Sequence, residues 1–238
     1  MKKLIAFICF IFAISIIDSN VYAMTNKNGV EIDDNIYQKL VYYYGDEYLM
    51  TMTNDDYNYL ISQDINNIKM VSIDDTQEYS LLSDDVTTNY KKLKIVVAGN
   101  RVTIRLDWLV QPKVKNYDIT AARLSGVKLN SIIGAKYIYG SDYEIQQISG
   151  IKTFDNGLGF SFKMPTSKIL CIFLEFSISG SGNIYATYQH STTNRINYAQ
   201  SQNFYLSNSG LGRVLSFKNG LEKYYDAMNG VSIAVWVA

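Results

Sequence analysis

The clearest pattern of apolar and polar positions lies in residues 168–190, which read KILCIFLEFSISGSGNIYATYQH. Every second residue from Leu170 to Ile178 is apolar, and the opposite face turns polar at Glu175. A period of two predicts a β-strand, and the partly apolar second face predicts a central strand covered on both sides. Residues 180–183, GSGN, tolerate positive φ and predict a tight hairpin, so the residues after them are expected to form the return strand.

Similar alternation recurs in short segments that Gly, Asn and Ser residues separate. In residues 101–110, for example, Val102 and Ile104 share one face while Arg101 and Arg105 share the other. The remaining segments are residues 92–98, 117–129, 136–139, 143–148, 157–164, 203–207, 213–217 and 231–237. Many short strands joined by regular turns predict a mainly β fold, here a two-sheet antiparallel β-sandwich, of which the jelly roll is one form.

The N-terminal part of the mature chain has a helical period instead, and it predicts a small helical segment. Asp33-Asp34 can cap a helix over residues 35–44, and Gly45 is well suited to end it. Thr53 precedes Asp56 by three residues, which is the spacing of a capping box and predicts the start of a second helix.

Charge divides the chain at the same place. Residues 24–90 hold 13 Asp and Glu against three Lys, whereas residues 91–238 hold eight Asp and Glu against 17 Lys and Arg. Residues 24–90 are therefore predicted to be an acidic N-terminal helical segment with a connecting loop, and residues 91–238 a basic β-sandwich domain. The polar residues 74–89 are expected to form a loop that leaves room for a short edge strand. Opposite charge and short amphipathic helices predict that the two parts pack together within one molecule, through apolar residues Ile36, Leu40, Tyr57 and Leu60.

The first residues predict export. Residues 1–3 are a short basic start, residues 4–17 are almost entirely apolar, and Val21 and Ala23 stand at the positions that a signal peptidase reads. Residues 1–23 are therefore predicted to be a signal peptide, and the mature protein is predicted to be secreted and extracellular, with no transmembrane anchor. Export also argues against nucleic acid as a partner.

Three stretches of the mature chain resemble a group of small secreted proteins of unassigned function from low-GC Gram-positive bacteria, clostridia especially. These stretches are IYQKLVYYYGDEYLMTMTNDDYNYL, VTIRLDWLVQPKVKNYDITAARL and GSGNIYATYQHST. The resemblance covers most of the mature chain. It implies secretion and a shared fold, and it implies no catalytic residues.

Residue types that carry chemistry are sparse. His190 is the only histidine, and after removal of the signal peptide Cys171 is the only cysteine. These two cannot form a zinc site by themselves, and Cys171, alternating with apolar residues, is predicted to be a buried, inert thiol. We predict no catalytic residue, no metal site and no cofactor. The alternative is calcium at the four Asp-Asp pairs, residues 33–34, 55–56, 74–75 and 84–85, although helix caps and turns explain the first two.

Tyrosine is abundant, with 20 residues in the chain. Its rigid amphipathic ring suits contact with sugars and other polar ligands, although most tyrosines are expected to fill strands and the helix–sheet interface. Two clusters stand out, one around a Gly-Ser turn and one along the central hairpin. The ligand-binding candidates are Tyr137, Tyr139, Tyr143, Tyr185, Tyr188, Gln189 and His190.

Three functions are compatible with these observations. The first is a secreted, non-enzymatic β-sandwich protein that binds a surface component, either a glycan or an anionic envelope polymer. The second is a secreted hydrolase of glycans or esters, which needs two carboxylates, or His190 and a carboxylate, to converge in one cleft. Its carboxylate candidates, Asp107, Glu144 and Glu175, are scattered along the sequence. The third is a membrane-active, toxin-like protein.

Overall fold

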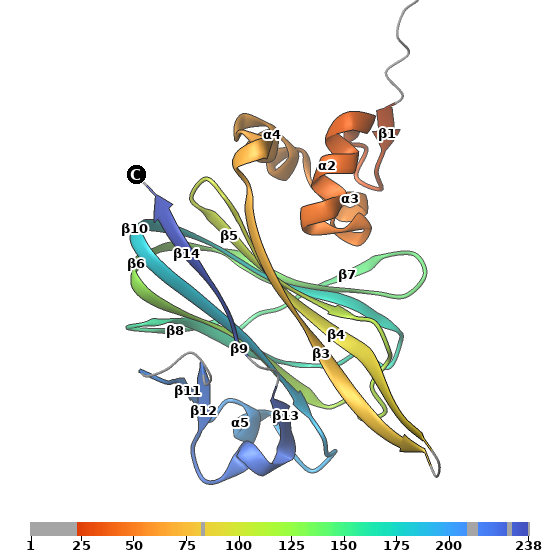
Figure 1. Cartoon of the computed structure of the whole chain (residues 1–238), viewed down its shortest axis with the longest axis vertical. Helices are drawn as coiled ribbons and strands as arrows, with labels where there is room; N and C mark the ends of the chain where they lie inside the picture. Colours follow the sequence, from red (N-terminus) through yellow and green to blue (C-terminus); the bar gives the residue numbers. More distant parts are fainter. Residues whose placement is uncertain (1–22, 82–83, 209–213, 228–229, 238) are drawn as a thin grey trace, which may run out of the picture.

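The computed structural model describes residues 23–81, 84–208, 214–227 and 230–237, with residues 73–89 described by their backbone (Figure 1). The predicted signal peptide, apart from Ala23, lies outside the described residues. The described chain is mainly β, and each of its paired strands runs antiparallel to its partner. None of the helices in these ranges has the length and apolar character that crossing a membrane requires.

Three helices precede the long strands in the sequence. Within the described residues the helical elements are α2 (Asp34–Tyr44), α3 (Asp46–Thr51), α4 (Asn54–Ser62), η1 (Ile65–Asn67), α5 (Tyr198–Ser201) and η2 (Leu221–Tyr224). The strands are β1 (Ala23–Thr25), β2 (Glu31–Asp33), β3 (Lys69–Leu81), β4 (Asp84–Ala98), β5 (Arg101–Trp108), β6 (Tyr117–Tyr139), β7 (Glu144–Gln147), β8 (Lys152–Phe154), β9 (Gly157–Lys163), β10 (Ile169–Ser191), β11 (Phe204–Leu206), β12 (Leu215–Phe217), β13 (Tyr225–Ala227) and β14 (Val231–Val237).

One continuous sheet of ten strands organises the fold. Its order is β3-β4-β5-β10-β6-β9-β8, with β13 and β14 also paired to β10 and β7 paired to β6. The two long strands β6 and β10 pair with each other over most of their lengths, and β10 pairs on its other edge first with β5 and then with β14. β6 and β10 therefore join two layers, one containing β3, β4, β5 and β7 and the other containing β8, β9, β13 and β14.

The main hydrophobic core lies between these two layers. Leu93 and Ile104 come from the first layer, and Phe160 and Val231 come from the second; all four are buried in one cluster. A core enclosed by two antiparallel layers is consistent with a β-sandwich.

The predicted hairpin at residues 180–183 is wrong, because β10 runs through these residues as one strand. The partner strand of β10, β6, runs without interruption through residues 130–135, whereas the sequence pattern predicts two separate strands on either side of these residues. Gly180 and Gly126 adopt positive φ of 85° and 83°, and the pairing register shifts between Gly180 and Asn183. The glycines thus bend β10 from one layer into the other, because a bulge turns a strand without reversing it.

The predicted loop over residues 74–89 is also wrong, because the structure has two long paired strands there and not a loop with at most a short edge strand. β3 and β4 pair from Lys69 opposite Val97 out to Leu81 opposite Asp84. The two strands extend well past the rest of the sheet in Figure 1. Because each backbone finds hydrogen-bond partners on the other, the ladder continues through residues whose side chains give no apolar alternation.

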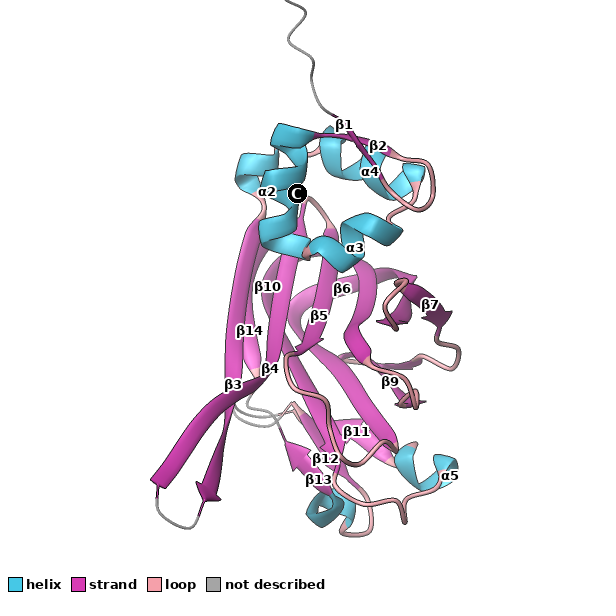
Figure 2. Cartoon of the chain, turned by 90° about the vertical axis from the view of Figure 1, so that its right-hand side faces the viewer, coloured by secondary structure: helices cyan, strands magenta, loops and turns pink. Residues whose placement is uncertain are grey.

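Helices α2 to α4 lie together at one end of the sheet (Figure 2). Leu40 and Leu60 are buried in a second hydrophobic cluster with Phe173 of β10 and Val96 of β4, and Ile36 and Tyr57 pack against this cluster, among other residues. The helical segment therefore packs on the sheet within one molecule, through the apolar residues that the sequence predicts.

Ion pairs connect the acidic helices to the basic strands. The Arg101 guanidinium lies 2.7 Å from the carboxylate of Asp56 in α4, and that of Arg105 lies 2.7 Å from Glu47 in α3. Burial on its own raises the pKa of Asp56, but the Thr53 hydroxyl and Arg101 outweigh it and hold this pKa below its usual value. The capping box between Thr53 and Asp56 is present, so one carboxylate both begins a helix and holds that helix to the sheet.

Candidate functional site

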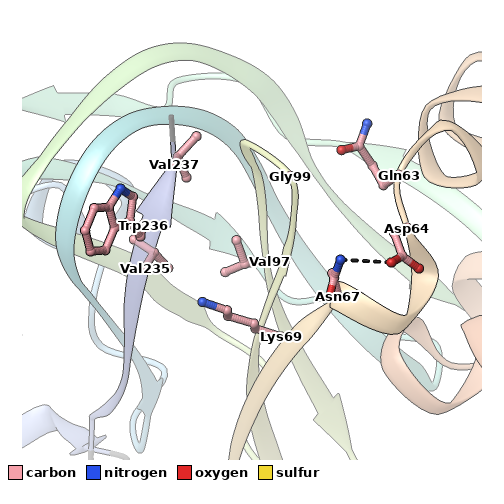
Figure 3. A pocket seen from close by; sticks show the side chains of 9 residues that line it. All are labelled: Gln63, Asp64, Asn67, Lys69, Val97, Gly99, Val235, Trp236 and Val237. Carbon is pink, nitrogen blue, oxygen red and sulfur yellow. Dashed lines mark hydrogen bonds between the residues drawn. The ribbon is translucent and has the colours of Figure 1, made fainter.

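A hollow of about 360 Å³ opens between β14 of one layer and the start of β3 in the other. Val235 and Val237 of β14 stand on one side of it, and Gln63 and Asp64, which follow α4, stand on the other (Figure 3). The complete lining is Gln63, Asp64, Asn67, Lys69, Val97, Gly99, Val235, Trp236 and Val237.

Trp236 is the most exposed large hydrophobic side chain among the described residues, with 84% of its surface accessible. Alternation along β14 explains its position, because Val235 next to it is buried in the core and successive side chains of a strand point to opposite faces. The indole therefore lies on the outward side of β14, at the rim of the hollow and away from Gln63, Asp64 and Asn67, where a ligand can reach it (Figure 3).

A second hollow of about 480 Å³ adjoins the first and shares Gln63, Gly99, Trp236 and Val237 with it. It adds Tyr59 and Asn100. We call the two hollows together the Trp236 groove. The φ of +57° favours glycine at Gly99, and a Cβ there would lie 2.2 Å from the Gln63 side-chain oxygen, so the end of that side chain would have to move.

Most polar groups of the Trp236 groove are held in place. The Tyr59 ring stacks 4.2 Å from the Arg101 guanidinium, and its hydroxyl lies 2.8 Å from the Ala98 carbonyl oxygen. Asp64 accepts a hydrogen bond of 2.9 Å from the side-chain amide of Asn67. Asp64 and Lys69 contribute one negative and one positive charge, so the lining carries amide, carboxylate and ammonium groups without an excess of either sign.

The predicted tyrosine cluster at the Gly-Ser turn divides between two interfaces. Tyr137 is half-buried and packs against the main core, with its ring centroid 5.6 Å from that of Phe162, and the Tyr139 ring lies 5.5 Å from that of Tyr137. Tyr143 instead donates a hydrogen bond of 3.1 Å to Asp46 of α3. Tyr137 and Tyr143 thus take part in internal packing, as tyrosines more often do.

The second predicted cluster is also largely internal. Tyr188 is fully buried, donates its hydroxyl to Asp118 and accepts a hydrogen bond of 3.2 Å from the Trp108 indole. Gln189 is buried and donates to the Thr187 hydroxyl at 3.2 Å. Tyr185 is half-buried, and the Arg123 guanidinium lies 4.3 Å from its ring. A direct ligand contact by Tyr188 or Gln189 is therefore not supported, because neither lines the Trp236 groove or the hollow around His190, although His190 itself is no more exposed than Gln189.

His190, another of the predicted ligand-binding residues, lines a third hollow. This hollow, of about 370 Å³, lies at the far end of β10, and Thr192 and Asp226 line it as well. The Nδ1 atom of His190 lies 2.9 Å from Asp118, a fully buried carboxylate of β6. His190 and two carboxylates thus converge, although these carboxylates are Asp118 and Asp226 and none of the three that the sequence suggests.

Sequence reasoning missed Trp236, but a signal for it exists. In VSIAVWV the residues Val231, Ile233, Val235 and Val237 share one face, and the opposite face holds Ser232, Ala234 and Trp236. A large aromatic among small residues on the outward face of an alternating strand marks an exposed ring.

The remaining candidates for chemistry give no site. Among the described residues no group of three or more His, Cys, Asp or Glu side chains is placed to hold a metal ion. Asp33 caps α2 and Asp56 takes part in the capping box of α4, so the first two Asp pairs act at helix ends. Cys171 is fully buried against the helical segment, and burial raises the pKa of its thiol, which fits an inert packing role.

The fold defines a mainly β, antiparallel protein in which a helical segment covers one end of the sheet. Comparisons of the chain with protein-family models, with curated proteins and with solved structures found no match in any of the three.

Proposed function

We propose that this chain is a secreted β-sandwich protein whose Trp236 groove binds a surface glycan without altering it. The observation that carries the proposal is a tryptophan with 84% of its surface accessible at the rim of a hollow lined by amides and a carboxylate. The apolar face of a sugar ring stacks on an aromatic side chain, while its hydroxyls pair with amide and carboxylate groups. Trp236 supplies the platform on the outward side of β14, and Gln63, Asp64 and Asn67 supply polar partners for neighbouring sugar units across the hollow.

The charge of the groove favours a neutral glycan over an anionic polymer. An anionic polymer requires a row of cations, because each phosphate or carboxylate needs a partner. The lining includes Lys69 and Asp64, whose charges are opposite. Arg101, next to Tyr59, is already paired with Asp56 at 2.7 Å.

Replacing Trp236 with Ala is expected to weaken glycan binding by about tenfold or more, since buried aromatic contacts commonly contribute well over about 1.4 kcal/mol to an interface. The melting temperature should stay close to that of the wild type, because exposed side chains contribute little to stability. A glycan-array screen identifies the ligand, and isothermal titration calorimetry on both proteins measures the loss.

The matched control is Tyr42→Ala, which removes an aromatic ring that is 65% exposed on α2, away from the groove. This variant should bind the glycan as the wild type does. If Trp236→Ala retains full affinity, or if Tyr42→Ala loses as much, the groove is not the binding site.

Secretion is part of the proposal and rests on the composition of residues 1–23. We expect the protein released into a culture supernatant to begin at Met24, directly after the small residue Ala23. Mass spectrometry of the released chain measures its first residue. A released protein that still carries Met1 would refute cleavage at this place.

A further inference from the structure

A second site lies around His190, close to the C-terminal end of β10. His190 pairs with Asp226 of β13 across the sheet, and both side chains line the hollow of about 370 Å³. The apolar part of the lining comes from a loop that follows β5, with Val110, Pro112 and Val114. The site is distinct from the Trp236 groove, because no residue lines both.

Asp118 sets the orientation of the histidine. Its carboxylate is fully buried and accepts hydrogen bonds from the Tyr188 hydroxyl, from the Ser191 backbone N–H at 2.8 Å and from His190 Nδ1 at 2.9 Å. Because a carboxylate oxygen accepts hydrogen bonds, Nδ1 of His190 is the donor of this pair and carries the proton. In the neutral ring the lone pair is then on Nε2, which has no hydrogen-bond partner among the described residues.

Asp226 adds a negative charge beside the ring. It accepts hydrogen bonds from the Tyr90 hydroxyl and from Lys91 Nζ at 3.1 Å. Burial on its own raises the pKa of Asp226, but Lys91 and Tyr90 outweigh it and hold this pKa below its usual value. An ionised carboxylate next to His190 stabilises the imidazolium that forms when the ring takes up a proton.

The opposite wall of the hollow is held in place as well. The Gln111 amide donates to the Ile169 carbonyl at 2.6 Å and accepts from the Ile169 backbone N–H at 2.9 Å. These two bonds fix the loop that carries Val110, Pro112 and Val114. A small acyl or alkyl group fits such an apolar wall, while Lys113 brings a cation to the same lining.

We propose that the His190 hollow is a hydrolytic site for small carboxylic esters, with His190 as general base. Nε2 takes a proton from a water molecule, whose oxygen forms a bond to the ester carbonyl carbon. The carbon–oxygen bond to the alcohol then breaks, and the proton on Nε2 passes to the alcohol oxygen. The products are one carboxylic acid and one alcohol, and water is the only other reactant.

Water is the nucleophile in this proposal because the hydroxyls of the lining, those of Tyr90 and Thr192, are engaged: Tyr90 donates to Asp226. The Thr192 side chain donates its proton to the Tyr224 carbonyl oxygen at 3.1 Å. An ester suits the site better than an amide, because an alcohol leaves more easily than an amine. Asp118 is a positioning residue, since it acts through His190 and is itself fully buried.

The first test is hydrolysis of p-nitrophenyl acetate and p-nitrophenyl butyrate by the full mature chain. His190→Gln should lower the rate by about a hundredfold or more, which is the usual contribution of a general base. Asn194→Ala, an exposed change close by in the sequence, should leave the rate unchanged. If His190→Gln hydrolyses these esters as fast as the wild type, or if the wild type is no faster than free imidazole, the proposal fails.

The second test separates orientation from folding. Because His190 is the only histidine, its imidazole ¹⁵N signals can be assigned without ambiguity. In the wild type we expect the proton on Nδ1, and in Asp118→Asn we expect a mixture of the two tautomers and a shifted pH–rate profile. The groups that face the ring or share its network are Asp118 of β6, Asp226 of β13, Tyr90 and Lys91 of β4, Tyr188 of β10 and Lys113. An unchanged tautomer in a folded Asp118→Asn protein would contradict the positioning role.

The hydrolytic site does not depend on glycan binding. Trp236→Ala should hydrolyse p-nitrophenyl acetate at the wild-type rate, and His190→Gln should bind the glycan with wild-type affinity. Each proposal can therefore fail while the other stands.

Discussion

Replacing Arg105 with Leu is expected to lower the free energy of unfolding by about 3 kcal/mol, because removing one partner of a buried ion pair leaves a charge without compensation. Arg105 is 4% exposed, and its guanidinium donates to Asp107 at 2.5 Å and to Glu47 of α3 at 2.7 Å. It therefore holds the helical segment to the sheet. For a chain of this length the melting temperature should fall by about 6–12 °C.

We place this effect at the lower end of the range for buried pairs, for two reasons. Lys94 stays 3.5 Å from Asp107, and the Glu47 side chain is 28% exposed. Arg195 is the matched control, because it is exposed and Arg195→Leu should change stability by less than about 0.5 kcal/mol. Chemical denaturation measures both variants, and equal midpoints for Arg105→Leu and the wild type would show that Arg105 does not hold the helices.

Replacing Gly182 with Ala is expected to destabilise the fold by about 3 kcal/mol, since a new methyl group in a closely packed place forces the backbone to move. A Cβ at Gly182 would lie 2.0 Å from the Ser125 carbonyl oxygen and 2.9 Å from Gly126 Cα, and both are backbone atoms that cannot rotate away. The bend that carries β10 from one layer to the other should therefore open.

Gly134 of β6 provides the control, because a Cβ at that position meets no atom within 4 Å and its φ is not positive. Gly134→Ala should leave stability unchanged or raise it by up to about 1 kcal/mol, through loss of freedom in the unfolded chain. Thermal unfolding of the two variants measures the difference. If both variants unfold with the wild-type midpoint, close packing at the β6–β10 bend does not restrict which residue position 182 tolerates.

The local sequence pattern was sufficient to predict those elements whose structure depends only on residues close by in the sequence. Residues 231–237 alternate and form β14 with the same bounds, and residues 157–164 differ from β9 by one residue. The Thr53–Asp56 capping box is present because it involves only groups one helical turn apart. A mainly β chain with antiparallel strands could therefore be predicted from periodicity and turn residues.

The same local reasoning failed at residues 180–183. A GSGN stretch permits both a hairpin and a bent strand, because glycine allows positive φ in either. The outcome depends on Gly126, more than fifty residues earlier, which lies opposite the bend in β6. No window of sequence around position 180 contains that neighbour.

The sequence by itself determined the alternation that makes the strands, the caps that begin the helices and the opposite charges of the two parts. The tertiary structure alone decided the candidate sites, because their residues meet only through long-range pairing. Asp118 and His190 are 72 positions apart and come together because β6 and β10 pair in register, with Ile119 opposite Gln189. The residues of the Trp236 groove likewise come together only where β14 of one layer meets the segment after α4, and the spacing of side chains within one strand does not determine that approach.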